Sequence, residues 1–178
     1  MPFPFRKIAK RLQEGDAATT TEEVGAALED IMTWSLCALP GVRVLHRDFV
    51  NHGNSAEFDL FLFNNPRLSP IEFLPQYLVV ECKNWQAAVG SATVRDFIGK
   101  VESTRLEVGI LVAANGVTGD ANERTAANDE IRAAFDRRGT KILILTRAEI
   151  EGFRSADDLV LLLEEKFGKA CLRSTTLG

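Results

Sequence analysis

Three polar side chains interrupt two of the most apolar segments of this sequence. Asp59 stands inside Phe58-Asp59-Leu60-Phe61-Leu62-Phe63, and Glu81 and Lys83 close the run that begins Leu78-Val79-Val80. A charged group in a buried strand is costly unless it is paired or holds a metal. Because successive side chains of a strand point to opposite faces, Glu81 and Lys83 project to the same side. These residue types indicate a candidate catalytic centre.

A divalent cation is the expected partner of Asp59 and Glu81. If their strands are neighbours, the two carboxylates face each other and repel, and a cation resolves that repulsion. Mg²⁺, for which Mn²⁺ can substitute, prefers few carboxylates and accepts phosphate oxygens. Such an ion promotes phosphodiester hydrolysis by polarising the phosphate and activating a water. Lys83 would stabilise charge on the transition state or, with a lowered pKa, help to deprotonate the water.

A purely structural role is the alternative for the same residues. Glu-x-Lys alone is common in charged chains, a Glu and a Lys at the end of a strand often form only a surface ion pair, and an isolated Asp at the start of a strand is often a turn residue. Here both elements occur in order, within or at the carboxyl ends of apolar strands, with helical segments before and after. This co-occurrence favours catalysis by Asp59, Glu81 and Lys83.

The surrounding elements predict an α/β protein with a mixed central sheet flanked by helices. A helical pattern that starts at the capping residue Thr20 precedes three strand patterns, and two later strands alternate with helices, which is typical of a mixed sheet. The strands are expected at 42–51, 56–63, 77–83, 108–114 and 141–145. We expect one domain over residues 1–178, with a basic N-terminal segment at 1–18, a core at 20–152, and a C-terminal helix and tail at 153–178.

Composition limits the possible classes of protein without selecting one. The net charge of −4 counts against a protein that coats nucleic acid non-specifically, although it does not exclude a nuclease. The sequence has no run of about 18 apolar residues, so we expect no membrane span. The three cysteines are an odd number with no close pair, which argues against a disulfide framework and against a zinc site. A reducing cytoplasm fits this chain best.

The ordered motifs resemble those of the PD-(D/E)xK nucleases, and within them the Mrr-like restriction endonucleases and archaeal-type Holliday junction resolvases. Glu57-Phe58-Asp59 stands where the family has its metal-binding Asp, and Glu81-Cys82-Lys83-Asn84-Trp85 matches the Glu/Gln-x-Lys element with its trailing aromatic residue. Gly25-Ala26-Ala27-Leu28-Glu29 is similar to the family's first-helix segment, whose Glu assists metal binding. The resemblance covers residues 20–152, and it departs from the family in having no proline before Asp59.

The resemblance implies a restriction-endonuclease-like fold with an αβββαβ core, extended here by a C-terminal α-β-α unit. It also implies a Mg²⁺- or Mn²⁺-dependent endonuclease that hydrolyses DNA in restriction or another prokaryotic defence role, with RNA left open as a substrate. Asp59 and Glu81 would bind the metal, with the backbone carbonyl of Cys82 and the side chain of Glu29 as further candidate ligands. Trp85 and Thr118 are candidate substrate contacts, for which packing and a helix cap are the respective alternatives.

Several alternatives stay open at this point. A homodimer would supply the two active sites that cutting both strands requires, and a partner protein from a defence system could supply specificity. The main rival function is a nuclease-fold subunit that binds or assembles without cleaving. A second rival is an unrelated α/β protein in which Glu81–Lys83 is a structural ion pair and Asp59 lies far from Glu81.

Overall fold

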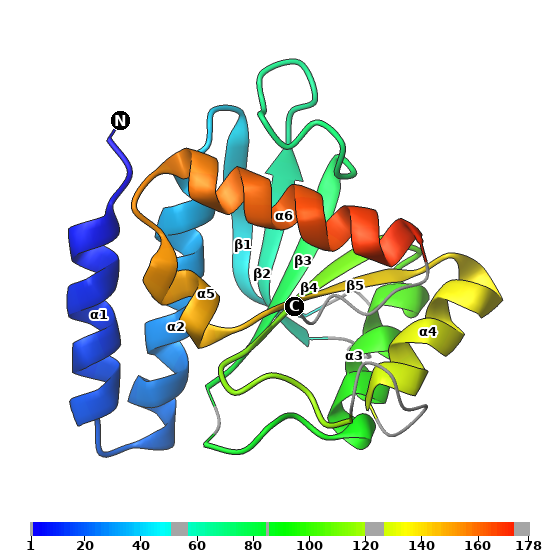
Figure 1. Cartoon of the computed structure of the whole chain (residues 1–178), viewed down its shortest axis with the longest axis horizontal. Coiled ribbons are helices and arrows are strands. Elements are labelled where there is room, and N and C mark those ends of the chain that lie inside the picture. Colours follow the sequence, from blue (N-terminus) through cyan, green and yellow to red (C-terminus); the bar gives the residue numbers. More distant parts are fainter. Residues whose placement is uncertain (1, 51–56, 85, 120–126, 173–178) are drawn as a thin grey trace.

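A computed structural model of the chain describes residues 2–50, 57–84, 86–119 and 127–172. Its helices and strands follow one another along the chain in the order predicted from the sequence (Figure 1). They are α1 (Phe5–Ala17), α2 (Thr21–Cys37), β1 (Val42–Val50), β2 (Glu57–Asn64), β3 (Tyr77–Lys83), α3 (Ser91–Ser103), β4 (Val108–Ala113), α4 (Ala127–Arg138), β5 (Lys141–Leu145), α5 (Arg147–Gly152) and α6 (Ala156–Cys171).

The five strands form one sheet in the order β1-β2-β3-β4-β5. β1 pairs with β2, and β2 with β3, in antiparallel fashion, whereas β3, β4 and β5 are parallel. The predicted mixed sheet is therefore confirmed. Residue 51 of the strand expected at 42–51 and residue 56 of the strand expected at 56–63 lie outside the described residues.

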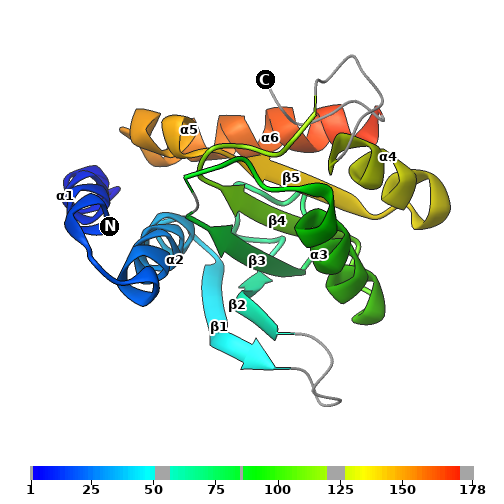
Figure 2. The ribbon, with the colours of Figure 1, turned by 90° about the horizontal axis from the view of Figure 1, so that it is seen from below.

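Two apolar clusters cover the opposite faces of the sheet, and the ribbon shows α2 and α3 on opposite sides of it (Figure 2). Along β3, Val80 belongs to the cluster that also takes residues from α1, α2, α5 and α6, whereas Val79 belongs to the cluster under α3 and α4. This alternation follows from the two-residue period of a strand. Strands covered on both faces read as continuous apolar runs, and β4 is buried at every position.

The basic N-terminal segment is helix α1, and it packs against the rest of the protein. Its Ile8 and Leu12 are buried in the first cluster. The ammonium of Lys7 lies 3.5 Å from the ring centroid of Trp34 on α2, and Arg11 pairs with Asp30 on the same helix. These two basic side chains are therefore already engaged by α2.

The Leu-rich segment at residues 159–163 lies on helix α6. Leu159 and Leu163 are fully buried in the first cluster, whereas Leu161 is 62% exposed. The segment is therefore a core helix with one outward leucine. No helix within the described ranges is long and apolar enough to span a membrane.

Gly109 sets the distance between α3 and the sheet. A Cβ atom at this position would lie 2.8 Å from Phe97 Cζ and 2.8 Å from Val101 Cγ2, both on α3. Real Cβ atoms do not approach other atoms that closely, so the absence of a side chain lets α3 sit directly on β4. This close packing determines where the polar side chains of α3 reach relative to β3.

We expect Gly109→Ala to lower the free energy of unfolding by about 1–3 kcal/mol, because the added methyl group overpacks this contact. Gly99→Ala is the matched control, since a Cβ at Gly99 meets nothing within 4 Å. Alanine is the better helix former, so the control should be neutral or stabilising by up to about 1 kcal/mol. Urea denaturation measures both variants, and equal effects would contradict this account of Gly109.

Candidate active site

Strands β2 and β3 part at the residues that the sequence singled out. Their paired register runs from Phe63↔Tyr77 to Leu60↔Val80, and one further step would set Asp59 opposite Glu81. At that step the Asp59 side chain replaces backbone pairing, because Asp59 Oδ2 accepts a hydrogen bond of 2.5 Å from the backbone N–H of Cys82.

The ring of Phe58 shows the same departure of β2 from β3. Alternation along β2 would place Phe58 on the face of Leu60, yet its ring packs edge-on against Phe97 of α3, with centroids 6.5 Å apart. The opening between the strands therefore lies beside Asp59 and Glu81.

Burial and neighbouring carboxylates strongly disfavour the charged form of Asp59. Burial is the largest cause, the charges of Glu81 and Glu29 add to it, and the Cys82 N–H and Lys83 oppose it; together they raise the pKa of Asp59 to about 7. The second rival interpretation required Asp59 to lie far from Glu81. That placement is wrong, because the two carboxylates are close enough to repel.

Glu81 is a buried carboxylate, and one of its oxygens contacts two lysine ammonium groups. Its side chain is 6% exposed, and its Oε1 lies 2.8 Å from Lys83 Nζ and 3.1 Å from Lys100 Nζ. Its other oxygen, Oε2, is buried and has no hydrogen-bond partner among the described residues. A buried polar atom without a partner is rare, and a cation bound at Oε2 would satisfy this one.

Lys83 points to the same side as Glu81, as strand alternation predicts. Burial lowers the pKa of Lys83, but the hydrogen bond and charge of Glu81, together with the charge of Asp59, outweigh burial and raise that pKa. The ammonium form is therefore favoured.

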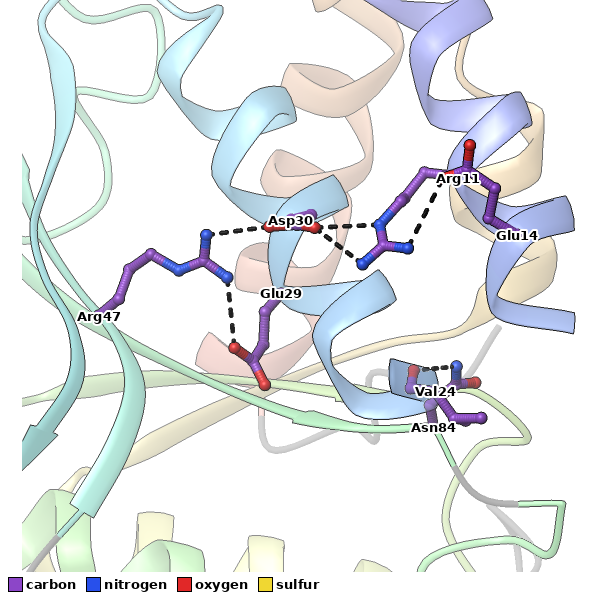
Figure 3. A network of polar contacts seen from close by, with 7 residues as sticks. All are labelled: Arg11, Glu14, Val24, Glu29, Asp30, Arg47 and Asn84. Carbon is purple, nitrogen blue, oxygen red and sulfur yellow. Dashed lines mark hydrogen bonds and ion pairs between the residues drawn. The ribbon is translucent and has the colours of Figure 1, made fainter. Parts of the chain in front are cut away.

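Glu29, on α2, approaches the centre from another element. Burial first, and the charge of Asp48 second, raise the pKa of Glu29, while Arg47 opposes them. Arg47 of β1 reaches Glu29 Oε2 at 3.4 Å and Asp30 Oδ1 at 2.9 Å, and Arg11 of α1 holds the other oxygen of Asp30 (Figure 3). Glu29 thus lies within electrostatic range of Asp59 but is engaged by Arg47.

Three neighbours of the centre were not identified from the sequence: Arg47, Asp48 and Lys100. The pairs Arg47↔Leu60 and Phe49↔Phe58 bracket Asp48 opposite Asp59, and Asp48 has a φ of 48°, in the left-handed region that Asp tolerates better than most residues. Arg47 and Asp48 are charges inside a strand, the same signal that identified Asp59. Lys100 gave only a weak signal, since it adjoins the apolar stripe of its helix.

The remaining predicted site residues lie at the carboxyl ends of β3 and β4 or outside the described residues. The Cys82 thiol is buried, and burial raises its pKa well above the ordinary value, so it behaves as a small apolar group. Thr118 lies after β4, where its N–H donates to the Val89 carbonyl and its carbonyl accepts from the N–H of Ala127. Trp85 lies outside the described residues.

A pocket of about 510 Å³ opens beside Lys83. Thr20, Val24 and Gly25 line it from the start of α2, and Lys83 and Asn84 line it from the end of β3. Asn84 Nδ2 donates a 2.7 Å hydrogen bond to the Val24 carbonyl, which ties the end of β3 to the first turn of α2 (Figure 3). Lys83 is therefore one of the residues that line a pocket between α2 and the end of β3.

The sheet order and the side chains where β2 and β3 part define a restriction-endonuclease-like α/β domain. The family model Mrr_cat, described as a restriction endonuclease, matches residues 40–138, which is more than half of the 178-residue chain. The chain therefore belongs to this restriction endonuclease family. No curated protein and no solved structure matches it.

The family match divides the candidate residues into two groups. Asp59, Glu81, Lys83 and Lys100 fall inside the matched range, and Glu29 falls outside it. In the part of the chain that the structure describes, no group of three or more His, Cys, Asp and Glu side chains is arranged to hold a metal ion.

The Asp59 pKa predicts a pH-dependent cost in stability for the metal-free protein. Since the folded-state pKa of about 7 exceeds the ordinary value of 3.8, Asp59 costs nothing below about pH 4 and destabilises increasingly as pH rises towards 7. In EDTA, Asp59→Asn should therefore be more stable than the wild type at pH 8, by about 1–3 kcal/mol, with the difference vanishing near pH 4. Urea denaturation at both pH values measures this.

The exposed Asp96 on α3 offers the control for the same chemical change. Asp96→Asn should give a smaller gain at pH 8, because its carboxylate is not buried against another. An Asp59→Asn protein no more stable than the wild type at pH 8 would contradict the repulsion described here.

Proposed function

We propose that this protein is a Mg²⁺- or Mn²⁺-dependent endonuclease that hydrolyses DNA phosphodiester bonds, in restriction or another prokaryotic defence role. The observation that carries the proposal is the opposition of Asp59 and Glu81 where β2 and β3 part, with Glu81 Oε2 buried and without a partner among the described residues. Membership of a restriction endonuclease family supports the same reaction.

The donor set fits a hard divalent cation. Asp59 and Glu81 supply two mutually repelling carboxylates, and that repulsion favours a cation between them. Within a strand the N–H and C=O of one residue point the same way, so the Cys82 carbonyl shares the side of its N–H, which bonds to Asp59. Oxygen donors of this kind suit Mg²⁺. Glu29 would be an outer ligand once it leaves Arg47.

When bound, the cation would polarise the phosphate and assist the formation of the nucleophile from water. Asp59 and Glu81 would hold it at the parting of the strands. Lys83, kept as an ammonium, would approach the phosphate from the adjoining pocket and stabilise its growing negative charge. Thr118 and Trp85 remain candidate substrate contacts.

The proposal also covers the domain organisation, the cellular compartment and the partners of the protein. Residues 1–178 would act as a single nuclease domain, with 20–152 as its core, in a reducing cytoplasm. Cys37, Cys82 and Cys171 are free thiols, and disulfides are rare in proteins of such a compartment. A homodimer would supply the second active site for cutting both strands, and a defence partner would add specificity.

A nuclease-fold subunit that binds without cleaving is the second candidate. It is favoured by the net charge of −4 and by the engagement of Lys7, Arg11 and Arg47 with groups of the protein itself. Metal binding and catalysis distinguish the two candidates, because a subunit that has lost the reaction has no need of a metal at Glu81.

Metal binding is expected without DNA. The wild type should bind Mn²⁺ in calorimetry, and Asp59→Asn and Glu81→Gln should each weaken that binding by at least roughly tenfold, since each removes a carboxylate ligand. Asp96→Asn, an exposed change of the same kind, should bind Mn²⁺ as the wild type does. Equal affinity in all four proteins would place any metal elsewhere.

DNA cleavage is expected to need both the metal and the side chains of Asp59 and Lys83. Supercoiled plasmid should be nicked or linearised with Mg²⁺ or Mn²⁺ but not with EDTA, and Asp59→Ala and Lys83→Ala should each slow cleavage at least about a hundredfold. Lys10→Ala, on the exposed side of α1, should leave the rate unchanged. A wild type that leaves plasmid and RNA intact with either metal would support the non-cleaving subunit.

A further inference from the structure

Helix α3 delivers a second ammonium to the buried carboxylate of the centre. Lys100 Nζ lies 3.1 Å from Glu81 Oε1, the same oxygen that Lys83 Nζ contacts at 2.8 Å. The Lys100 ammonium also lies 6.0 Å from the ring centroid of Phe58, the residue before Asp59. Lys100 therefore spans from α3 to the point where β2 and β3 part.

The position of Lys100 follows from rigid packing. Phe97 and Val101, which flank it on α3, are buried and press on the bare backbone of Gly109. The Lys100 side chain is 26% exposed and the Glu81 side chain 6% exposed, so their interaction is screened far less than a surface ion pair.

Two ammonium groups on one carboxylate exceed what neutralising Glu81 requires. With Lys83 alone, moving the ammonium towards a substrate would leave a buried carboxylate uncompensated, which is strongly unfavourable. With Lys100 also on Oε1, Glu81 stays neutralised and oriented when Lys83 turns away. Oε2, which has no hydrogen-bond partner among the described residues, then stays available to a cation.

We propose that Lys100 is a positioning residue of the nuclease centre, holding Glu81 Oε1 so that the Lys83 ammonium is free to engage the scissile phosphate. This inference rests on the proposed nuclease function. Lys100 acts through Glu81 and Lys83 and has no direct part in the reaction.

The experiment compares Lys100→Met, Lys100→Gln and Lys100→Arg with the wild type. Calorimetry measures Mn²⁺ affinity without DNA, and steady-state cleavage of a DNA duplex gives kcat and KM. Removing the charge should tighten Mn²⁺ binding roughly three- to tenfold, because one cation fewer competes at Glu81. It should also lower kcat at least about tenfold with KM within about twofold, because Lys83 stays paired with Glu81. Lys100→Arg should restore most of kcat.

Arg95→Met is the matched control, since Arg95 is an exposed cation on α3 that pairs with Glu130 of α4. It should change neither Mn²⁺ affinity nor kcat. Lys100→Gln keeps a hydrogen-bond donor without the charge, and it gives the same comparison if the methionine variant does not fold.

A rise in Mn²⁺ affinity together with a fall in kcat distinguishes a positioning role of Lys100 from a structural one. If both fall, Lys100 merely supports the fold, and if neither changes, it has no role at the centre; each outcome overturns the inference. A wild type that binds Mn²⁺ without cleaving would contradict the proposed function instead. In that case the Mn²⁺ affinity alone tests the inference about Lys100. Tighter Mn²⁺ binding in Lys100→Met would support the coupling between Lys100 and Glu81, and unchanged binding would overturn it.

Discussion

The burial of Asp59 beside Glu81 is the constraint around which this structure is arranged. Backbone pairing between β2 and β3 ends at Leu60↔Val80, and the next backbone N–H, that of Cys82, bonds to the Asp59 carboxylate instead. The Asp59 side chain thus satisfies a buried donor that an ordinary ladder would have paired. The carboxylate is held in place at the cost of a pKa raised to about 7, so local stability is given up at the centre.

The surrounding scaffold makes that loss of stability tolerable. β3 and β4 are buried on both faces, and their parallel register holds Glu81 beside Leu111 and Lys83 beside Ala113. Precise placement of functional groups requires rigid supporting elements. Here α3 supplies one by packing without a gap on Gly109, and the Asn84 hydrogen bond to the Val24 carbonyl fixes the start of α2 beside the end of β3.

Charge is distributed in a way that the net value of −4 conceals. Basic groups of α1 and β1 are engaged with α2, through Trp34 for Lys7 and through Asp30 for Arg11 and Arg47. Lys83 and Lys100, by contrast, converge on a single buried oxygen of Glu81. The carboxylates of the centre and these two lysines therefore form one charged cluster that the net charge of the whole chain does not reveal.

From the sequence alone one can predict the mixed α/β architecture, the order of the strands along the chain, and the charges Asp59, Glu81 and Lys83 inside apolar strands. These follow from periodicity and from the cost of burying charge, which act along one segment at a time. The folded chain adds that β2 leaves β3 at Asp59, that Asp48 stands opposite it, and that Lys100 reaches Glu81 from α3. Such contacts depend on strand register and on how closely a helix packs on the sheet, and neither is encoded in the spacing of residues within a single element.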